Sequence, residues 1–244
     1  KRPAMYIGST DERGLHHLVY EAVDNSVDET LAGHCDLIEV TLHVDNSASI
    51  SDNGRGIPVG IHPEYKIPAL EVIMTTLHAG GKFDNKSYQV SGGLHGVGIS
   101  VVNALSSRLD VEVQREGNAW SQSYGVGSPT TELKKLDRIT NETGTKIRFW
   151  PDSDIFESLD FNFSTLSSRL RELAFLNPEA TIVLSDERTG ESQSFKYDGG
   201  IKELVSYLNE NKAALHEDVI FIKNEINMVV VEVALQSTES LQSS

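Results

Sequence analysis

Residues 14–32 read Gly-Leu-His-His-Leu-Val-Tyr-Glu-Ala-Val-Asp-Asn-Ser-Val-Asp-Glu-Thr-Leu-Ala. Apolar residues recur here every three or four positions, which predicts an amphipathic helix that Gly33 ends. The apolar positions are Leu15, Leu18, Val19, Ala22, Val23 and Val27. The opposite side carries a stripe within about one third of the circumference, made of His17, Glu21, Asp24, Asn25 and Asp28.

This stripe on the first helix contains no lysine or arginine, although a solvated helix face usually mixes both signs of charge. A magnesium ion held with nucleotide phosphates would offset the repulsion, because Mg²⁺ prefers hard oxygen ligands such as the Asn25 carbonyl. Glu21, one turn earlier, is then placed to polarise a water against a γ-phosphate, and His17 to orient Glu21. The alternative interpretation is an ordinary solvated face.

Two glycine-containing segments add to this pattern. Asp52 ends a predicted strand just before Gly54 and Gly56, where a carboxylate can accept from the amine of adenine and the glycines let the base approach. A simple turn is the alternative. Residues 92–98 carry four glycines before a predicted helix, whose N–H groups can hold phosphate oxygens. The segment matches neither a Walker A loop nor a dinucleotide fingerprint.

The rest of the chain mixes helices and strands without strict β-α-β alternation. This mixture predicts an α+β two-layer sandwich rather than a doubly wound fold. We expect a mobile loop at 79–91. Helices are expected at 68–78, from about 96 through 105, and at 164–176; strands are expected at 38–44, 48–51, 109–114, 119–124, 146–150, 181–185 and 192–197.

The pair Gly199-Gly200 is the best candidate for a domain boundary. Residues 1–199 would then form a nucleotide-binding domain. Residues 200–244 are expected to hold a helix at 201–212 and strands near 219 and at 228–235. We interpret this second part as the beginning of a further domain that is not present in full.

The amino-acid composition excludes several classes of protein. The 244 residues are 39% hydrophobic, enough for one full core. A single cysteine excludes an internal disulfide, and the absence of an apolar leader or membrane-length apolar run predicts a cytoplasmic protein. The net charge of -15 opposes a surface that grips DNA over much of its area.

Read together, the strings at 21–29, 52–58, 91–98 and 143–145 resemble the N-terminal ATPase domain of type II topoisomerase B subunits. That domain has the Bergerat fold of the GHKL superfamily, which also holds heat-shock chaperones, sensor histidine kinases and mismatch-repair ATPases. The strings at 77–83 and 144–151 resemble topoisomerases only. Those at 169–177 and 231–236 are more similar to gyrase-type than to topoisomerase IV-type B subunits, and the topoisomerase IV type is the alternative. The resemblance extends over nearly the whole chain, through residues 2–8, 14–17, 77–83, 91–105, 144–151, 166–177 and 231–236.

The resemblance implies residue roles. Glu21 would be the general base supported by His17, Asn25 would bind Mg²⁺, and Asp52 would bind adenine with Thr145 through water. Lys82 and Tyr88 would belong to a lid. The other nucleotide-binding positions would be Gly56, Ile57, Gly93, Leu94, His95, Gly96, Val97 and Gly98, with Glu29, Arg55, Pro58 and Arg115 at the mouth, where aminocoumarin-type inhibitors bind in the family. For Arg55 and Arg115 a surface ion pair is the alternative.

The resemblance also implies a function. ATP binding and hydrolysis would drive self-dimerisation and clamp closure for DNA strand passage and supercoiling, with the gyrase A subunit and DNA as partners. The family's arm before Lys1 and its Gln-Thr-Lys loop are missing from the sequence, so we expect a fragment that binds ATP but turns over slowly by itself. The other function class is a nucleotide-gated dimerisation module. Glu21 favours an enzyme, because binding alone needs no water-polarising carboxylate.

Overall fold

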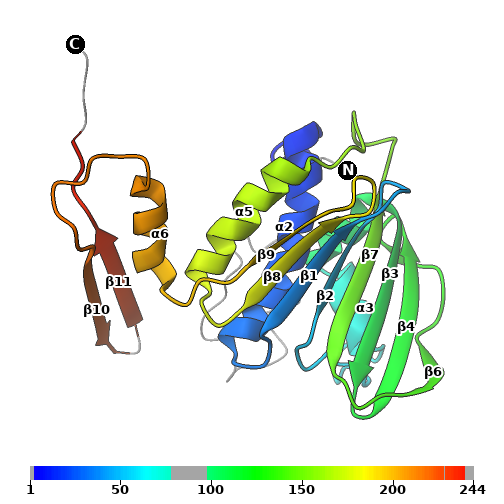
Figure 1. Ribbon diagram of the computed structural model, residues 1–244. Helices are drawn as coiled ribbons and strands as arrows, with labels where there is room; N and C mark the ends of the chain where they lie inside the picture. The colour runs from blue at the N-terminus through cyan, green and yellow to red at the C-terminus, as the bar shows by residue number, and fades with distance from the viewer. Residues whose placement is uncertain (1–2, 78–97, 228, 240–244) are drawn as a thin grey trace.

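The structure is a computed structural model that describes residues 3–77, 98–227 and 229–239 (Figure 1). The loop expected at 79–91 therefore lies outside the described residues. So do the positions predicted to form a lid, Lys82 and Tyr88, and those predicted to bind phosphates, Gly93, Leu94, His95, Gly96 and Val97.

Nine strands of the described chain form one sheet in the order β5-β4-β3-β7-β2-β1-β8-β9, with β6 paired to β4. All neighbours are antiparallel except β1 and β8, which run parallel. The strands are β1 (Leu37–Leu42), β2 (Ala48–Asp52), β3 (Ser106–Arg115), β4 (Asn118–Gly125), β5 (Ser128–Pro129), β6 (Lys134–Ile139), β7 (Gly144–Pro151), β8 (Thr181–Asp186) and β9 (Glu191–Phe195).

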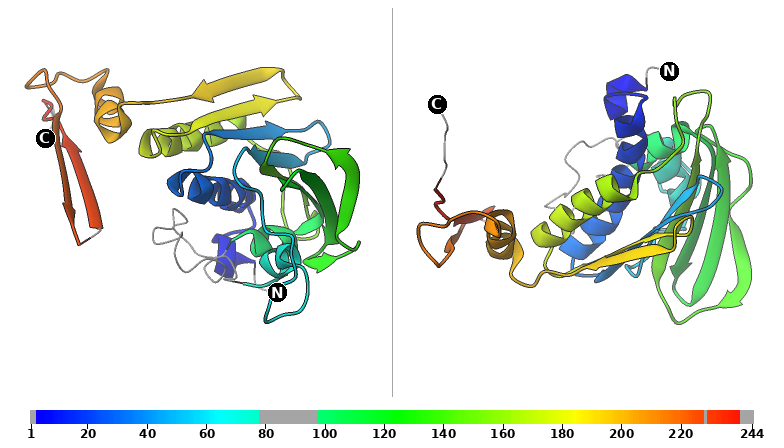
Figure 2. Two further views of the ribbon diagram at one scale, coloured as in Figure 1. Left: turned by 90° about the horizontal axis from the view of Figure 1, so that it is seen from below. Right: turned by 45° about the horizontal axis from the view of Figure 1, so that its top comes forward.

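The helices of this part lie on one face of the sheet, as the views in Figures 1 and 2 agree. The expected two-layer α+β sandwich is therefore confirmed. None of the helices in the described ranges is long and apolar enough to cross a membrane. The helices are α1 (Ala4–Ile7), α2 (Glu12–Leu31), α3 (Ala69–Thr75), α4 (Ile99–Ala104) and α5 (Phe163–Leu176).

Helix α2 is the central element of the helical layer. It begins where the side chain of Asp11 accepts from the backbone N–H groups of Arg13 and Gly14, which satisfies two of the donors that a helix start leaves open. It ends before Gly33, whose φ of +77° suits glycine. The six apolar positions predicted from the sequence are all buried. The predicted helix and its buried face are confirmed.

Alternation along the central strands decides which side chains reach α2. Ile50 of β2 is buried against the helical layer, and because side chains alternate, Asp52 points to the same side. The antiparallel register of β2 and β7 pairs Asp52 directly with Thr145. Both site residues therefore face the helices at neighbouring strand ends.

Several expected boundaries were wrong. Helix α3 begins after Pro68 and ends at Thr75, so it is shorter than the prediction at its C-terminal end. Helix α4 begins at Ile99 rather than near 96, because Gly98 has a φ of +69°, which is not helical. Strands β5 and β6 were not predicted, since their side chains are mostly exposed and show no alternation.

The C-terminal part consists of α6 (Gly200–Asn209) and a two-stranded antiparallel sheet of β10 (Ile220–Ile226) and β11 (Val229–Leu235). It lies beside the end of α5 (Figure 1). Arg171 of α5 donates to the Tyr207 hydroxyl of α6 at 2.7 Å. The expected helix and strands are confirmed, and the start of α6 coincides with the predicted boundary. The division into two domains stays a prediction.

Candidate active site

Asp52 at the end of β2 forms the first part of the site. Its Oδ1 accepts from the backbone N–H groups of Gly54 at 3.0 Å and Thr145 at 3.3 Å. Its Oδ2 accepts from the Ser26 hydroxyl of α2 at 2.9 Å. Burial raises the pKa of Asp52, although these hydrogen bonds act in the opposite direction. Donors from α2, from the following loop and from β7 therefore hold this carboxylate in place.

Glycines allow the backbone to close in around Asp52. A Cβ on Gly144 would lie 2.1 Å from the carbonyl oxygen of Asp52, and one on Gly56 would lie 2.6 Å from the carbonyl oxygen of Gln114. Because Gly56 also has a φ of +77°, a side chain there would be strained as well as crowded. The Thr145 hydroxyl accepts from the backbone N–H of Ile57 at 3.2 Å, which ties this loop to β7.

Glu21 of α2 forms the second part of the site. Its side chain is only 4% exposed. The Nε2 atom of His17 lies 3.1 Å from its Oε1, and the backbone N–H of Gly98 donates to its Oε2 at 2.9 Å. The structure thus brings the predicted base, its predicted supporting histidine and the last glycine of the phosphate-loop string together.

The Asn25 side chain lies on the same face of α2. Its Nδ2 donates to the backbone carbonyl of Glu21 at 2.8 Å, which fixes the orientation of the amide. The amide oxygen accepts no hydrogen bond from the described residues. In the described part of the chain, no three histidine, cysteine or carboxylate side chains are grouped as a metal site.

The stripe on α2 is electrostatically crowded. Burial, followed by the charges of Glu21 and Asp28, raises the pKa of Asp24 to about 7. The carboxylates therefore repel one another, as the sequence pattern indicated. A cation or hydrogen-bond donors arriving at this face would relieve that repulsion.

The predicted mouth residues lie around the loop after β2. Glu29 of α2 accepts from Arg55 through Nη2 at 2.9 Å and through Nε and the backbone N at 3.1 Å each. This two-pronged pair is partly buried, unlike a simple surface ion pair. Arg115 donates to the carbonyl oxygen of Gly56 at 2.7 Å and pairs with the exposed Glu116. Pro58, later in the same loop, is exposed.

One helix connects the two parts of the site. Ser26 and Glu21 are five residues apart on α2, roughly 7.5 Å along its axis. The sequence interpretation missed Ser26, although it lies inside the acidic string, because a serine within a helix more often bonds its own backbone. Only the pairing of β2 against α2, which local sequence does not reveal, identifies its partner.

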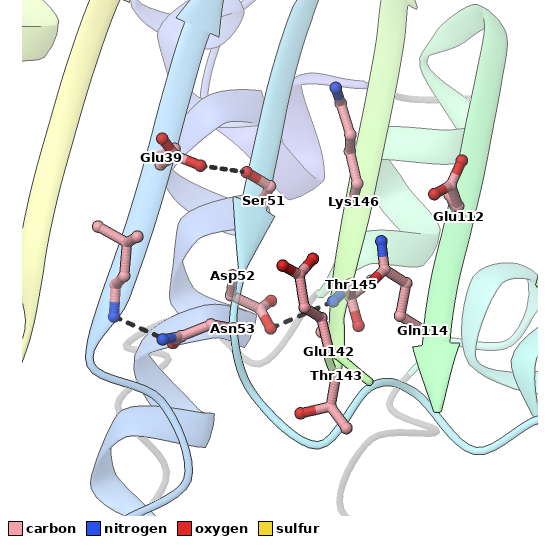
Figure 3. A pocket seen from close by; sticks show the side chains of 12 residues that line it. Glu39, Ser51, Asp52, Asn53, Glu112, Gln114, Glu142, Thr143, Thr145 and Lys146 are labelled. Atoms are coloured by element: carbon pink, nitrogen blue, oxygen red, sulfur yellow. Dashed lines mark hydrogen bonds between the residues drawn. The ribbon is translucent and has the colours of Figure 1, made fainter. Parts of the chain in front are cut away.

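A hollow of about 540 Å³ lies on the opposite, open face of the sheet (Figure 3). It shares Asp52 and Thr145 with the site, at the ends of β2 and β7. Its other charged side chains are Glu39, Glu112, Glu142 and Lys146. With Asp52, four carboxylates against one ammonium group make it a poor place for phosphates.

Comparison with known proteins identifies the family of this chain. Residues 10–155 match the family model described as "Histidine kinase-, DNA gyrase B-, and HSP90-like ATPase". The chain is 64% identical over its whole length to the DNA gyrase B protein of Haloferax volcanii and 56% identical, over 98% of its length, to that of Thermotoga maritima. It spans 39% and 38% of these two relatives.

A solved structure shares the fold. The 43K ATPase domain of Thermus thermophilus gyrase B, crystallised in complex with an aminocoumarin, superposes with a TM-score of 0.85 at 41% identity. The match covers 97% of the present chain and 61% of that one. The resemblance to gyrase-type B subunits is therefore confirmed, and with more than half of its residues matched by the family model, the chain belongs to the histidine kinase-, DNA gyrase B- and HSP90-like ATPases.

Proposed function

We propose that this chain is the ATP-binding and ATP-hydrolysing module of a gyrase-type B subunit. The observation that carries the proposal is the arrangement on α2. This helix contacts a partly buried carboxylate acceptor, Asp52, through Ser26, and it holds a buried carboxylate base, Glu21, about one and a half turns away. The two groups are proposed to meet opposite ends of a purine nucleotide, one at its base and one at its terminal phosphate.

Adenine recognition falls to Asp52. A carboxylate offers about four acceptor positions, and three of those on Asp52 receive protein donors. The remaining position suits the exocyclic amine of adenine. A 6-oxopurine would bring a carbonyl oxygen against the carboxylate and be rejected.

Hydrolysis falls to Glu21. Its carboxylate would take the proton of a water while the water oxygen forms a bond to the γ-phosphorus and the bond from that phosphorus to the bridging oxygen breaks, giving ADP and phosphate. His17 would act as a positioning residue for Glu21, since their side chains lie 3.1 Å apart. Gly98 would hold the second carboxylate oxygen through its backbone N–H.

A magnesium ion fits the α2 face. The Asn25 amide is turned by its bond to the Glu21 carbonyl so that its oxygen is the atom left for a cation. Mg²⁺ usually keeps several waters and takes few protein ligands, which agrees with a single amide oxygen beside nucleotide phosphates. Bound there, Mg²⁺ would supply neutralisation of phosphate charge.

The partners of the whole protein are part of the same proposal. Its relatives are DNA gyrase B subunits, so a gyrase A subunit, DNA and a second copy of the chain are the proposed partners, in a cytoplasmic setting. Aminocoumarins are proposed to bind at the mouth formed by Glu29, Arg55, Pro58 and Arg115, because the Thermus thermophilus domain was crystallised with one. Residues 200–244 are proposed to begin a second domain, supported by their separate two-stranded sheet.

Calorimetry with non-hydrolysable triphosphate analogues tests the binding part of the proposal. We expect the ATP analogue with Mg²⁺ to bind at least tenfold more tightly than the GTP analogue, and binding to weaken when Mg²⁺ is removed. Equal binding of the two analogues, or none of either, would contradict the proposed function. Hydrolysis is measured as phosphate release by the full-length protein.

A further inference from the structure

The proposed function counts Ser26 among the donors to Asp52 but assigns it no role of its own. Its side chain is buried at 2% exposure on α2. Its hydroxyl donates to Oδ2 of Asp52 at 2.9 Å, across 26 residues of sequence. A hydroxyl carries one proton, so this bond uses the only donor that Ser26 has.

The hydrogen bonds of Asp52 are divided unequally between its two oxygens. Oδ1 receives two backbone donors, from Gly54 and Thr145, which fill its two acceptor positions. Oδ2 receives Ser26 alone among the described residues. The one acceptor position left for a ligand is therefore on Oδ2, and the Ser26 hydroxyl holds that oxygen in place.

We propose that Ser26 is a positioning residue that makes the site select a base with an exocyclic amine over one with a carbonyl at the same position. The inference rests on the proposed function, because it assumes that Asp52 meets the base of a nucleotide. It goes beyond that function by assigning part of the base preference to a helix residue rather than to the carboxylate alone.

The physical reason is the protonation state of Asp52. A charged carboxylate only accepts, so it favours an amine; a neutral carboxyl can also donate, so it tolerates a carbonyl. Burial already raises the pKa of Asp52, and the bond from Ser26 counteracts that effect. Removing the hydroxyl therefore moves the pKa further up and brings the neutral form closer to the working pH.

Other groups near Asp52 both raise and lower its pKa. The charge of Glu29 on α2 raises the pKa of Asp52, and Glu29 is itself paired with Arg55 in the loop. The thiol of Cys35, which follows α2, also senses the charge of Asp52. Strand β7 contributes the backbone N–H of Thr145. None of these groups is changed by a substitution at Ser26.

The test measures the affinity ratio of two nucleotides whose bases carry an amine or a carbonyl at this position, the carbonyl form also carrying a proton on the neighbouring ring nitrogen. Non-hydrolysable analogues of ATP and of inosine triphosphate, each with Mg²⁺, are titrated calorimetrically between about pH 5.5 and 8.5, a range that brackets neutral pH. We expect Ser26→Ala to lower the preference for the adenine nucleotide about five- to twentyfold. The loss should be larger at low pH, because more of Asp52 is then neutral.

Two further variants make the comparison specific. Thr30→Val removes another buried hydroxyl one turn along α2, which bonds the Ser26 carbonyl and not Asp52. It should leave the ratio and its pH dependence within about twofold of the parent, as expected for a site without direct contact. Ser26→Thr keeps the hydroxyl and should restore the preference. Ser26→Cys keeps the volume but donates weakly, and carries the test if the alanine variant does not fold.

The outcomes separate the two claims. If the parent shows no preference for the adenine nucleotide, the proposed function fails. If the parent prefers adenine and Ser26→Ala keeps both the ratio and its pH profile, Ser26 does not position Asp52 and the inference fails. If Thr30→Val reduces the ratio as much as Ser26→Ala, the effect is a general loosening of α2 and the inference also fails.

Discussion

The two ends of the site organise their carboxylates in opposite ways. At the base end, Asp52 is held by donors from α2, from the following loop and from β7. At the phosphate end, Glu21, Asp24 and Asp28 share one helix and repel one another. In the proposed function, the protein itself satisfies most acceptor positions of Asp52 at the base end, whereas the repulsion at the phosphate end is relieved only by groups that arrive with the ligand. The proposed site is therefore preorganised for base recognition but not for charge neutralisation.

The largest expected effect is that of Glu21→Gln, which should lower turnover but not nucleotide affinity. Glu21→Gln keeps an acceptor for the Gly98 N–H but cannot take a proton, so we expect turnover to fall about 10²- to 10⁴-fold. Nucleotide affinity should stay within about tenfold, because the base acts only in the transition state. Phosphate release by the full-length protein and calorimetry measure the two quantities. A parallel loss of both would show that Glu21 is a binding group.

A smaller effect is expected at the base end, on affinity. Asp52→Asn replaces one acceptor oxygen by an amide that faces donors from Ser26 or from the backbone, and leaves buried donors unpaired. We expect ATP to bind about 10- to 100-fold more weakly, which corresponds to about 1.4 to 2.7 kcal/mol. Calorimetry measures the affinity, and thermal unfolding checks that the fold is intact. Unchanged affinity would make Asp52 a structural turn residue.

The burial of Asp24, together with the charges of Glu21 and Asp28, predicts a pH-dependent stability. The pKa of Asp24 is about 7 in the folded protein against an ordinary value of 3.8, so the folded state binds this proton more tightly. The unfolding free energy should therefore fall as pH rises from about 4 to about 7. Asp24→Asn removes this loss, and after allowance for solvent screening we expect a gain of about 1 kcal/mol above pH 7.

Urea denaturation at about pH 4.5 and about pH 8 checks the Asp24 prediction. The parent and the variant should differ little at the lower pH, where the aspartate is mostly neutral in the folded protein. Mg²⁺ with a nucleotide should narrow the difference at the higher pH, since the cation offsets the same repulsion. A variant that is equally stable or less stable than the parent at that pH would show that the stripe is not crowded.

The smallest effect is expected at Thr145. Thr145→Val removes the acceptor of the Ile57 N–H but keeps the backbone donor to Asp52. We expect ATP affinity to fall about three- to fivefold, close to the value of one neutral hydrogen bond. Thr145→Ser, which keeps the hydroxyl, is the matched control and should bind like the parent. A loss as large as that of Asp52→Asn would mean that Thr145 itself contacts the base.

Local periodicity explains how much of this site could be predicted. The two faces of α2 follow from its 3.6-residue repeat. The sequence therefore predicted its buried apolar positions correctly and placed Glu21 and Asn25 on one stripe of the helix, whereas their roles stay a prediction. The hairpin of β1 and β2 follows from alternation around the turn at Asn46, which has a φ of +60°. The fold class followed from the order of these elements.

Contacts between distant segments could not be predicted in the same way. The bonds from Ser26 to Asp52 and from Gly98 to Glu21 join residues 26 and 77 positions apart. Their geometry depends on how strands and helices pack, and a single sequence holds no periodic signal for it. The exposed strand β6 was missed for a related reason, since neither of its faces is buried enough to impose a pattern.

The parallel pairing of β1 with β8 has a consequence for synthesis on the ribosome. Leu37 pairs with Thr181, so the edge of β1 has to wait for about 140 further residues before its partner strand exists. At translation rates of about 5 to 20 residues per second, the nascent chain carries this open edge for roughly 7 to 30 seconds. Unpaired strand edges with apolar side chains promote association between chains. The pairing of β1 with β8 therefore forms late. We expect the incomplete nascent chain, with this edge unpaired, to be the form most prone to association with other chains.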